Sequence, residues 1–231
     1  MKKNSKNTGV IYDLTPFTLL DFPDKTACIL WFAGCNMRCG YCYNPLIVEG
    51  KGKITFDDVL HFLEKRKNLL DGVVFSGGEC TLHEGSIWLA KTIKDLGISV
   101  KIDTNGSRPL TLKKFIDQDL VDYLALDFKS MPKNFSTITR SHLFHLFEES
   151  LDLLINSDIP FEVRTTLHSE LISEDELEEM VRFLISKGFT GNYFLQHFID
   201  ETPTLELLPK STKRKYSKEY SSAGLTVIWR N

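Results

Sequence analysis

Three of the chain's five cysteines, Cys35, Cys39 and Cys42, lie in one short segment, CNMRCGYC. The spacing C-x3-C-x2-C places three thiolates on a tight loop, and thiolate is the ligand that iron–sulfur clusters use. A structural zinc site usually has four ligands in two separated pairs, so zinc would need a distant histidine here. Chance clustering of core cysteines fits poorly, because the loop is polar and glycine-rich. The spacing favours an iron–sulfur cluster with one corner that no cysteine binds.

The composition is that of a globular protein rather than a disordered or fibrous one. The chain has 231 residues, of which 42% are hydrophobic and 26% charged, and its formal net charge is -3. Without an overall basic field, we expect no nucleic-acid partner. The polar opening MKKNSKNTG and the lack of an apolar run of about 18 residues predict a cytoplasmic protein with no secretory leader and no membrane contact. An odd number of clustered cysteines also argues against a secreted disulfide framework.

Runs rich in β-branched and aromatic residues alternate with helix-like segments along most of the chain, which is typical of βα units. The strand-like runs occupy residues 26–34, 71–78, 97–106, 121–130, 159–167 and 191–198. Six units of roughly 30 residues fill residues 27–198, whereas a complete (β/α)8 barrel needs about 250 residues. We therefore predict an α/β fold, a partial (β/α)6 TIM-like barrel, as a single domain over residues 1–231. A short N-terminal extension precedes the barrel, and the last run, LTVIWRN, is expected to be a strand that covers a sheet edge.

Three of the intervening helices carry boundary signals. Apolar residues recur at three- and four-residue spacing in segments 55–70, 86–97 and 173–188. Gly97 and Gly188 are expected to end the second and third helices. Ser173 is expected to cap the start of the third helix, with Glu176 at the capping-box position.

Each predicted strand ends in residues that can do chemistry, and parallel βα folds place their catalytic groups at the carboxyl ends of the strands. In chain order these residues are the three cysteines, Gly77-Gly78-Glu79, Asp103-Thr104, Asp127 with Lys129, Arg164, and Gln196 with His197. We expect them to converge at one rim of the barrel. Taken singly, Asp103 and Asp127 would also suit turns, and His197 would suit an ordinary position at the rim.

The cysteine spacing resembles the hallmark of the radical S-adenosylmethionine (radical SAM) superfamily. In that family three cysteines, here Cys35, Cys39 and Cys42, hold one [4Fe–4S] cluster, and its remaining iron binds the amino and carboxylate groups of S-adenosylmethionine (SAM). The resemblance covers most of the chain and includes the GGE motif, here Gly77 to Glu79, one βα unit after the cysteines. It implies that the backbone of this motif meets the methionyl amino group, an approach that glycine permits.

The segment from residue 19 to 48, together with DTNG and LDFK, is similar to the glycyl-radical-enzyme activases, and most of all to those of the anaerobic ribonucleoside-triphosphate reductase. The resemblance implies a monovalent cation site beside the cofactor carboxylate, formed by Asp103, Thr104 and Asp127. It also implies the SAM contacts, which are Tyr41 against the adenine, Gly77, Gly78, Glu79, Asp103, Lys129, Arg164 and His197. The chain departs from the activase pattern at Asp24, Tyr43 and Cys80, none of which is an expected ligand.

The remaining candidate residues have ordinary interpretations. We interpret His61, His83, His142, His145 and His168 as surface or packing residues, Cys28 as core, and Cys80 as packing or a bystander thiol. The basic segment 210–220 is expected to be a solvated helix face, with docking onto an acidic partner surface as the alternative.

The resemblance implies an enzyme that cleaves SAM reductively to a 5′-deoxyadenosyl radical and makes a glycyl radical on a partner. The expected partner is the anaerobic ribonucleoside-triphosphate reductase, and the electron would come from an external one-electron donor such as flavodoxin or ferredoxin. Three alternatives stay open: a pyruvate formate-lyase-type activase, a small-molecule radical enzyme resembling 7-carboxy-7-deazaguanine synthase, and a zinc-bound interaction module.

Overall fold

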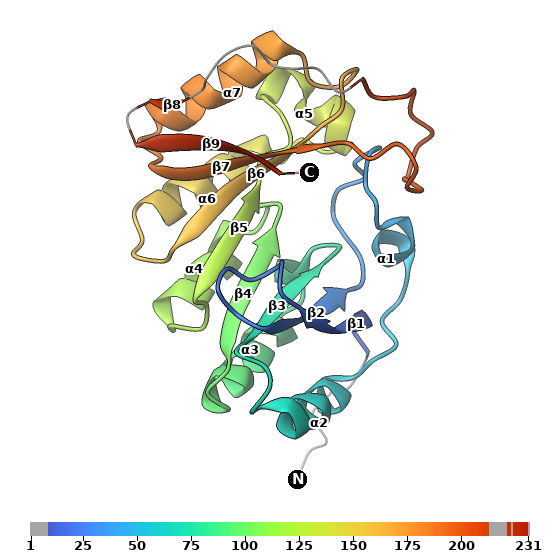
Figure 1. Cartoon of the computed structure of the whole chain (residues 1–231), viewed down its shortest axis with the longest axis vertical. Helices are drawn as coiled ribbons and strands as arrows, with labels where there is room; N and C mark the ends of the chain where they lie inside the picture. The colour runs from blue at the N-terminus through green and yellow to red at the C-terminus, as the bar shows by residue number, and fades with distance from the viewer. Residues whose placement is uncertain (1–8, 213–220, 223, 231) are drawn as a thin grey trace. The chain divides into compact units, whose positions relative to one another are not determined.

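A computed structural model of the chain describes residues 9–212, 221, 222 and 224–230. Within these residues the strands form one sheet in the order β1-β2-β3-β4-β5-β6-β7-β9-β8 (Figure 1). The strands are β1 (Ile11–Thr18), β2 (Ala27–Phe32), β3 (Gly72–Gly77), β4 (Ser99–Thr104), β5 (Tyr123–Asp127), β6 (Phe161–Leu167), β7 (Gly191–His197), β8 (Ser221–Ser222) and β9 (Leu225–Arg230). The helices are α1 (Pro45–Glu49), α2 (Phe56–Arg66), a 3-10 turn η1 (Cys80–Leu82), α3 (Gly85–Asp95), α4 (Pro109–Asp117), α5 (Pro132–Thr139), α6 (Phe144–Ile155) and α7 (Glu174–Ser186).

The predicted βα alternation, and with it the partial (β/α)6 barrel, is confirmed. Strands β2 to β7 lie inside the six predicted runs, and each of β2 to β6 is followed by at least one helix. The segment 213–220 after β7 lies outside the described residues, so the helix predicted for the basic segment 210–220 is not described.

By its internal contacts the chain divides into two compact units. Unit 1 comprises Met1–Asn36, Leu46–Thr104 and Leu110–Leu124, and unit 2 comprises Met37–Pro45, Asn105–Pro109 and Ala125–Asn231. The cysteine loop crosses this division, with Cys35 in unit 1 and the other two cysteines in unit 2. The single domain over residues 1–231 stays a prediction.

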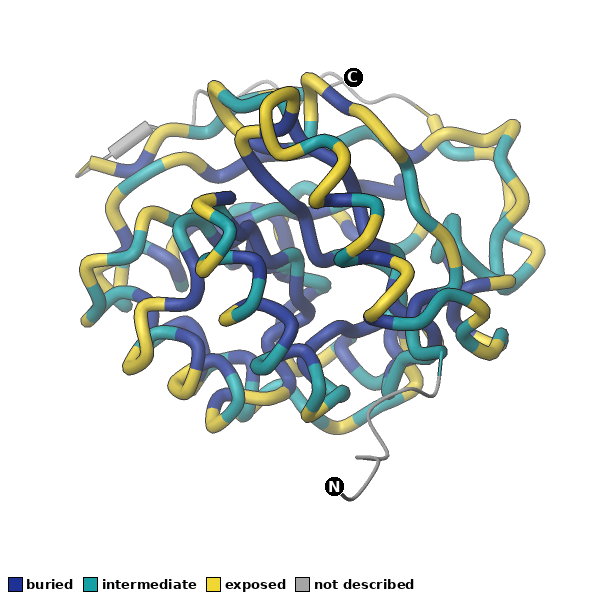
Figure 2. The backbone as a smooth tube through the Cα atoms, turned by 90° about the horizontal axis from the view of Figure 1, so that it is seen from below, coloured by how far each residue is buried: buried dark blue, intermediate teal, exposed yellow. Residues whose placement is uncertain are grey.

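In unit 1 the central residues of β2, β3 and β4 are buried on both faces, which explains why the β2 and β3 runs are mostly apolar in the sequence. Strand β2 pairs in parallel with β3, and β3 with β4. On one face Ile29 and Val74 pack with Phe22, Trp31 and Tyr123. In Figure 2 several extended segments are buried throughout, while helical segments alternate between buried and exposed residues.

Strand β1 was not expected, because the N-terminal part was predicted only as a short extension. It pairs antiparallel with β2, and its register shifts between Ile11 and Asp13 and again between Thr15 and Thr18. Pro16 lies in the second shift, which is consistent with proline being tolerated at irregular edge strands. The sequence signal of β1 is weak for the same reason.

The helix boundaries follow the predicted signals with one correction. Gly97 and Gly188 adopt φ of 77° and 81° just after α3 and α7, and the Ser173 side chain accepts the Glu176 N–H at 3.2 Å. The Glu176 carboxylate does not return to the backbone of Ser173. It accepts bonds from the Met131 N–H and the Asn134 side chain at the start of α5, so the predicted capping box is replaced by a link between two helices.

In unit 2 the C-terminal strand β9 covers the edge of β7, as predicted. Strand β7 pairs in parallel with both β6 and β9, and β8 then pairs antiparallel with β9. Arg230 fastens β9 in place, because its guanidinium pairs with buried Glu162 at 3.0 Å and lies 3.3 Å from the Phe194 ring centroid. None of the described helices is both long and apolar enough to cross a membrane.

Candidate active site

The cysteine loop begins in unit 1, where the segments after β2 and β3 continue to pair beyond the strands. The Gly78 N–H donates to the Phe32 carbonyl at 2.8 Å, and the Glu79 N–H donates to the Gly34 carbonyl at 2.9 Å. Gly34 directly precedes Cys35. The GGE motif therefore fixes the backbone that leads into the first cysteine.

The two glycines of this motif are required by a close approach inside the protein. Gly77 has φ of 116°, and a Cβ there would lie 2.4 Å from the Phe32 nitrogen. A Cβ on Gly78 would lie 1.9 Å from the Gly34 carbonyl oxygen, well inside van der Waals contact. The sequence had suggested an approach to a ligand as the reason for glycine. The structure supplies an internal reason, and contact between these glycines and SAM stays a prediction.

Glu79 is 1% exposed and joins the ends of β3 and β4. Its Oε1 accepts bonds from the Thr81 N–H and from the hydroxyls of Thr81 and Thr104, at 3.1, 2.5 and 2.8 Å. A buried carboxylate needs such donors to offset the cost of losing water. Glu79 thus holds the turn after β3 against Thr104, which had been predicted only as a cation ligand.

Both carboxylate oxygens of Asp103 are bonded within unit 1. Oδ1 lies 2.7 Å from the Lys101 ammonium and Oδ2 accepts the Ser76 hydroxyl at 3.2 Å. Lys101 was missed in the sequence, although a lysine two residues before an aspartate in a strand lies on the same face of the sheet. Cys80, whose Sγ donates to the Asp103 carbonyl at 3.5 Å, is fully buried packing.

His83 also supports this region, although the sequence suggested only a surface or packing role. Its Nε2 lies 2.8 Å from the Ala33 carbonyl oxygen, and its ring centroid is 5.7 Å from that of Phe32. His83 therefore holds the peptide just before Gly34. Its distance from the motif in sequence left no signal for this contact.

In unit 2 the rest of the cysteine loop is anchored through its backbone. The Cys42 N–H donates to the Cys39 carbonyl at 2.9 Å, which closes a tight turn between these two cysteines. The Arg38 N–H donates to the Thr139 carbonyl at the end of α5, and the Gly40 carbonyl accepts the Glu206 N–H at 3.0 Å. The loop is therefore held from both sides without using the thiols.

Tyr43 and Arg140 reinforce this anchoring. The Tyr43 hydroxyl accepts the Ile199 N–H at 2.7 Å, and its ring stacks on Phe198 with centroids 5.4 Å apart. Arg140 forms a two-pronged pair with Glu206, at 2.8 and 2.9 Å from its Nη2. Tyr43, a departure from the activase pattern, thus ties the loop to the segment after β7.

Tyr41, between the second and third cysteines, is 4% exposed. Its hydroxyl is buried and has no hydrogen-bond partner among the described residues. The Lys129 ammonium lies 5.8 Å from the centre of its ring. An unpaired buried hydroxyl costs about 1–3 kcal/mol, so Tyr41 is ready to bond with a group that binds beside the loop.

The Cys39 thiol is protonated at neutral pH in the metal-free chain. Burial raises its pKa to about 11, against the opposing effect of the Lys129 charge. Because metals bind the thiolate, iron must displace this proton when it binds. Cys35 and Cys42 are partly buried.

Asp127 forms the centre of a charged group at the ends of β5 and β6. Its carboxylate lies 3.1 Å from the Lys129 ammonium and 3.0 Å from the Arg164 guanidinium. Burial opposes ionisation of Asp127, but the two cations outweigh it and hold its pKa below the usual range. Burial likewise disfavours the charged form of Lys129, yet the Asp127 charge raises its pKa well above the ordinary value. All three side chains are therefore ionised at neutral pH.

His197, at the end of β7, stacks on Trp229 of β9 with ring centroids 4.8 Å apart and planes inclined by 21°. Trp229 of β9 therefore packs against the side chain that is predicted to contact SAM. Trp229 was assigned only to an edge strand in the sequence, so its position against His197 was missed.

The residues fit an iron–sulfur cluster in donor chemistry, since three thiols and an unpaired buried hydroxyl occur on one anchored loop. The predicted cation site fits less well, because Asp103 and Asp127 already accept bonds from lysine or arginine. In the part of the chain that the structure describes, no three His, Cys, Asp or Glu side chains converge as a preformed metal site. The predicted convergence of strand ends is seen within each unit, between β3 and β4 and between β5 and β6.

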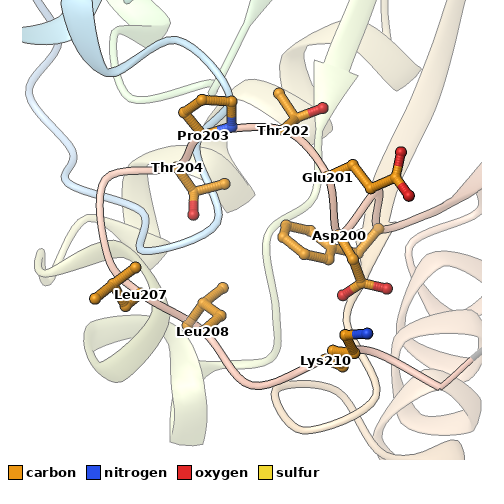
Figure 3. Close-up of a pocket in the computed structure, with 9 residues that line it drawn as sticks. Asp200, Glu201, Thr202, Pro203, Thr204, Leu207, Leu208 and Lys210 are labelled. Carbon is orange, nitrogen blue, oxygen red and sulfur yellow. The ribbon is translucent and has the colours of Figure 1, made fainter.

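A pocket of about 280 Å³ lies in unit 2, beside the anchored cysteine loop. It is formed by residues of the loop 198–210, the segment that contacts Gly40 and Tyr43. Figure 3 shows Asp200 and Lys210 on one side of the pocket and Leu207 and Leu208 on the other. Leu207 is fully exposed and Ile199 is 57% exposed.

The model of the radical SAM superfamily matches residues 29–184, more than half of the chain. The chain belongs to the radical SAM superfamily. A protein of Methanocaldococcus jannaschii, provisionally named a glycyl-radical enzyme activating enzyme, is 27% identical over 181 residues, 75% of each chain. The pyruvate formate-lyase-activating enzyme of Clostridium pasteurianum is 36% identical over 105 residues, 42% of this chain and 44% of its own length.

The fold of this radical SAM chain also matches solved structures. SuiB of Streptococcus suis, bound to the precursor peptide SuiA, superposes with a TM-score of 0.69 at 15% identity over 87% of this chain. The chain spans about half of that protein, with 48% of SuiB covered. At this identity the likeness shows the fold alone. Family membership implies one [4Fe–4S] cluster and SAM as cofactors, with Cys35, Cys39 and Cys42 as the residues that match the motif.

Gly78→Ala should lose most of its iron after anaerobic reconstitution, because the new Cβ would displace the peptide that leads into Cys35. Overpacking of this kind costs about 1–3 kcal/mol. Gly97→Ala is the control, since a left-handed alanine costs about 1–2 kcal/mol without any neighbour to displace. Iron per chain and thermal unfolding of both variants are the measurements. Full iron in Gly78→Ala would show that the GGE backbone does not position the loop.

Asp127→Asn should keep its iron but bind SAM about 10–100-fold more weakly, as losses of supporting residues at metal sites typically do. The amide keeps the shape while it removes the charge that balances Lys129 and Arg164. Asp122→Asn is matched to it, because Asp122 pairs with Lys94 at 2.6 Å and has a similar exposed fraction, 31% against 27%. Iron analysis and equilibrium SAM binding are the measurements. Loss of iron from a folded Asp127→Asn protein would show that Asp127 supports the cluster itself and not only the charges of Lys129 and Arg164.

Proposed function

We propose that this chain is a radical SAM activase that generates a glycyl radical on a partner enzyme, most specifically the anaerobic ribonucleoside-triphosphate reductase. The observation that carries the proposal is the anchored three-cysteine loop in a chain similar over three quarters of its length to a named activating enzyme. The electron would come from an external donor such as flavodoxin or ferredoxin, and such chemistry suits the reducing cytoplasm.

When bound and reduced, the cluster supplies one electron that breaks the C5′–S bond of SAM into methionine and a 5′-deoxyadenosyl radical. The chain's own residues bind the iron and orient SAM. Cys35, Cys39 and Cys42 hold the iron, while the fixed charges of Lys129 and Arg164 are available to the cofactor carboxylate. Tyr41 offers a buried ring and a hydroxyl without a partner among the described residues. These are interactions that a preorganised site supplies without reorganisation at the moment of reaction.

The surface beside the cysteine loop supports the proposal that the substrate is a protein. The loop 198–210 carries two exposed apolar side chains, Ile199 and Leu207. It is hydrogen-bonded to the cysteine loop through the backbone N–H groups of Ile199 and Glu206. Exposed apolar groups next to a functional site are typical of interaction surfaces. We therefore propose that the glycine-bearing region of the partner docks on the loop 198–210.

A monovalent cation is not part of the proposed site. The carboxylate oxygens of Asp103 and Asp127 already accept bonds from Lys101, Lys129 and Arg164. A cation at either carboxylate would have to compete with a positively charged side chain.

The anaerobically reconstituted chain should bind about four irons and, with reductant and SAM, produce a glycyl radical only when the anaerobic reductase is present. Electron paramagnetic resonance on the mixture is the measurement. Cys39→Ala should abolish both the iron and the doublet. Cys80→Ala is the matched control and should keep both, because its buried thiol lies outside the motif.

Other outcomes identify the alternatives. A radical on pyruvate formate-lyase alone would move the partner within the activase class. Turnover of a free metabolite without any protein radical would favour a small-molecule enzyme such as a 7-carboxy-7-deazaguanine synthase. Stoichiometric zinc without iron would refute the radical mechanism altogether.

Leu207→Asp should raise the concentration of activase needed for half-maximal radical formation by about tenfold or more, since burying a leucine contributes about 1.5–3 kcal/mol. SAM cleavage without the partner should not change. Leu69→Asp, at a leucine that is 66% exposed and lies before β3, is the control and should behave as wild type. Equal effects of the two substitutions would place the docking surface elsewhere.

A further inference from the structure

Lys101 is a buried lysine in the middle of β4, two residues before the DTNG motif that begins at the end of this strand. Its side chain is 2% exposed, and its ammonium lies 2.7 Å from the carboxylate of Asp103, which is itself 12% exposed. The two residues are two positions apart in one strand, so they lie on the same face of the sheet. Lys101 is thus the deeper member of the pair, and Asp103 is the more accessible one.

The surroundings of Lys101 make this pairing obligatory. It is opposite Val74 in the register of β3 and β4, and its ammonium lies 6.0 Å from the centre of the Tyr123 ring. Val74 and Tyr123 belong to the apolar cluster on that face. Burying an ammonium group is costly unless a close counter-ion compensates it. The pair therefore brings one fixed positive charge to the Asp103 carboxylate.

A monovalent cation at Asp103, as the family resemblance implies, would have to share this carboxylate with the ammonium. Hard cations bind through several oxygens. Here Oδ1 of Asp103 accepts a bond from the Lys101 ammonium, Oδ2 accepts one from the Ser76 hydroxyl, and the Thr104 hydroxyl donates to Glu79. A second positive charge within about 4 Å of the first would be repelled. Lys101 already supplies the charge that a bound cation would bring.

We propose that Lys101 is a positioning residue that takes the place of the monovalent cation, so that SAM binds to this chain without a dissolved cation. Lys101 holds the Asp103 carboxylate in one orientation and neutralises it where it faces the cofactor. The inference rests on the SAM-binding part of the proposed function and is independent of which enzyme the partner is.

The first test uses the unmodified protein with its cluster reconstituted. SAM affinity is measured by equilibrium binding, and by the change that SAM causes in the spectrum of the reduced cluster. Both are recorded in chloride salts of sodium, potassium or tetramethylammonium at equal ionic strength. We expect the affinity to agree within about twofold in all three salts, because the ammonium of Lys101 is part of the chain. A loss of about tenfold or more in tetramethylammonium, a cation too large for such a site, would overturn the proposal.

The second test removes the built-in charge. Lys101→Met keeps an unbranched side chain that is one atom shorter, and it should bind SAM about 10–100-fold more weakly in tetramethylammonium and recover when potassium or ammonium is added. A merely structural lysine would not produce rescue by a dissolved cation. Lys94→Met, which breaks the Lys94–Asp122 pair at the surface of unit 1, should show neither the loss nor the rescue. Lys101→Met that binds SAM like wild type without added cation would refute the proposal.

The uncompensated Asp103 could prevent Lys101→Met from folding. The double variant Lys101→Met, Asp103→Asn removes both charges of the pair and serves as its neutral form. It should keep its iron, bind SAM weakly, and show no rescue by potassium, because the carboxylate that would bind it is gone. Rescue of this double variant would contradict the assignment to Asp103. A protein that binds SAM independently of cations but makes no glycyl radical would refute the proposed function and leave this inference standing.

Discussion

The pairing of the backbone after β3 with the backbone after β2 is the constraint on which the candidate site depends. Parallel strands end at one edge of the sheet, and here two further N–H groups, of Gly78 and Glu79, continue the ladder to Phe32 and Gly34. The approach is so close that neither Gly77 nor Gly78 has room for a Cβ. The loop that starts at Cys35 therefore leaves the sheet from a peptide that is fixed by main-chain bonds, and this is the least adaptable way to hold it.

Charge balance is the second constraint, and each unit meets it separately. In unit 1 one carboxylate, Asp103, is matched by Lys101, and in unit 2 Asp127 is matched by Lys129 and Arg164. Buried charges are costly unless they are paired and hydrogen-bonded. The pairs hold each carboxylate in one orientation before any cofactor is present, which favours binding with little rearrangement.

The sequence predicted the six strands and the chemistry at their ends because both signals are local. Continuous apolar runs mark strands buried on both faces, and a cysteine spacing is read directly. What it missed depends on contacts between distant segments. The link from Glu176 to α5, the support of Ala33 by His83 and the stacking of His197 on Trp229 join residues between 32 and 50 positions apart. The edge strand β1 was missed because Pro16 and two register shifts remove the alternation that would have revealed it.

A charged side chain and a cation bound from solution place different requirements on the fold. A bound cation must be captured anew by each molecule, and its occupancy follows its concentration. A lysine is always present, but burying it costs several kcal/mol unless a carboxylate compensates it in good geometry. The 2.7 Å contact between Lys101 and Asp103 meets that requirement within a single strand, where residues two apart share a face. The same strand thus provides both the carboxylate and its counter-ion, and the Ser76 hydroxyl of β3 holds the second carboxylate oxygen.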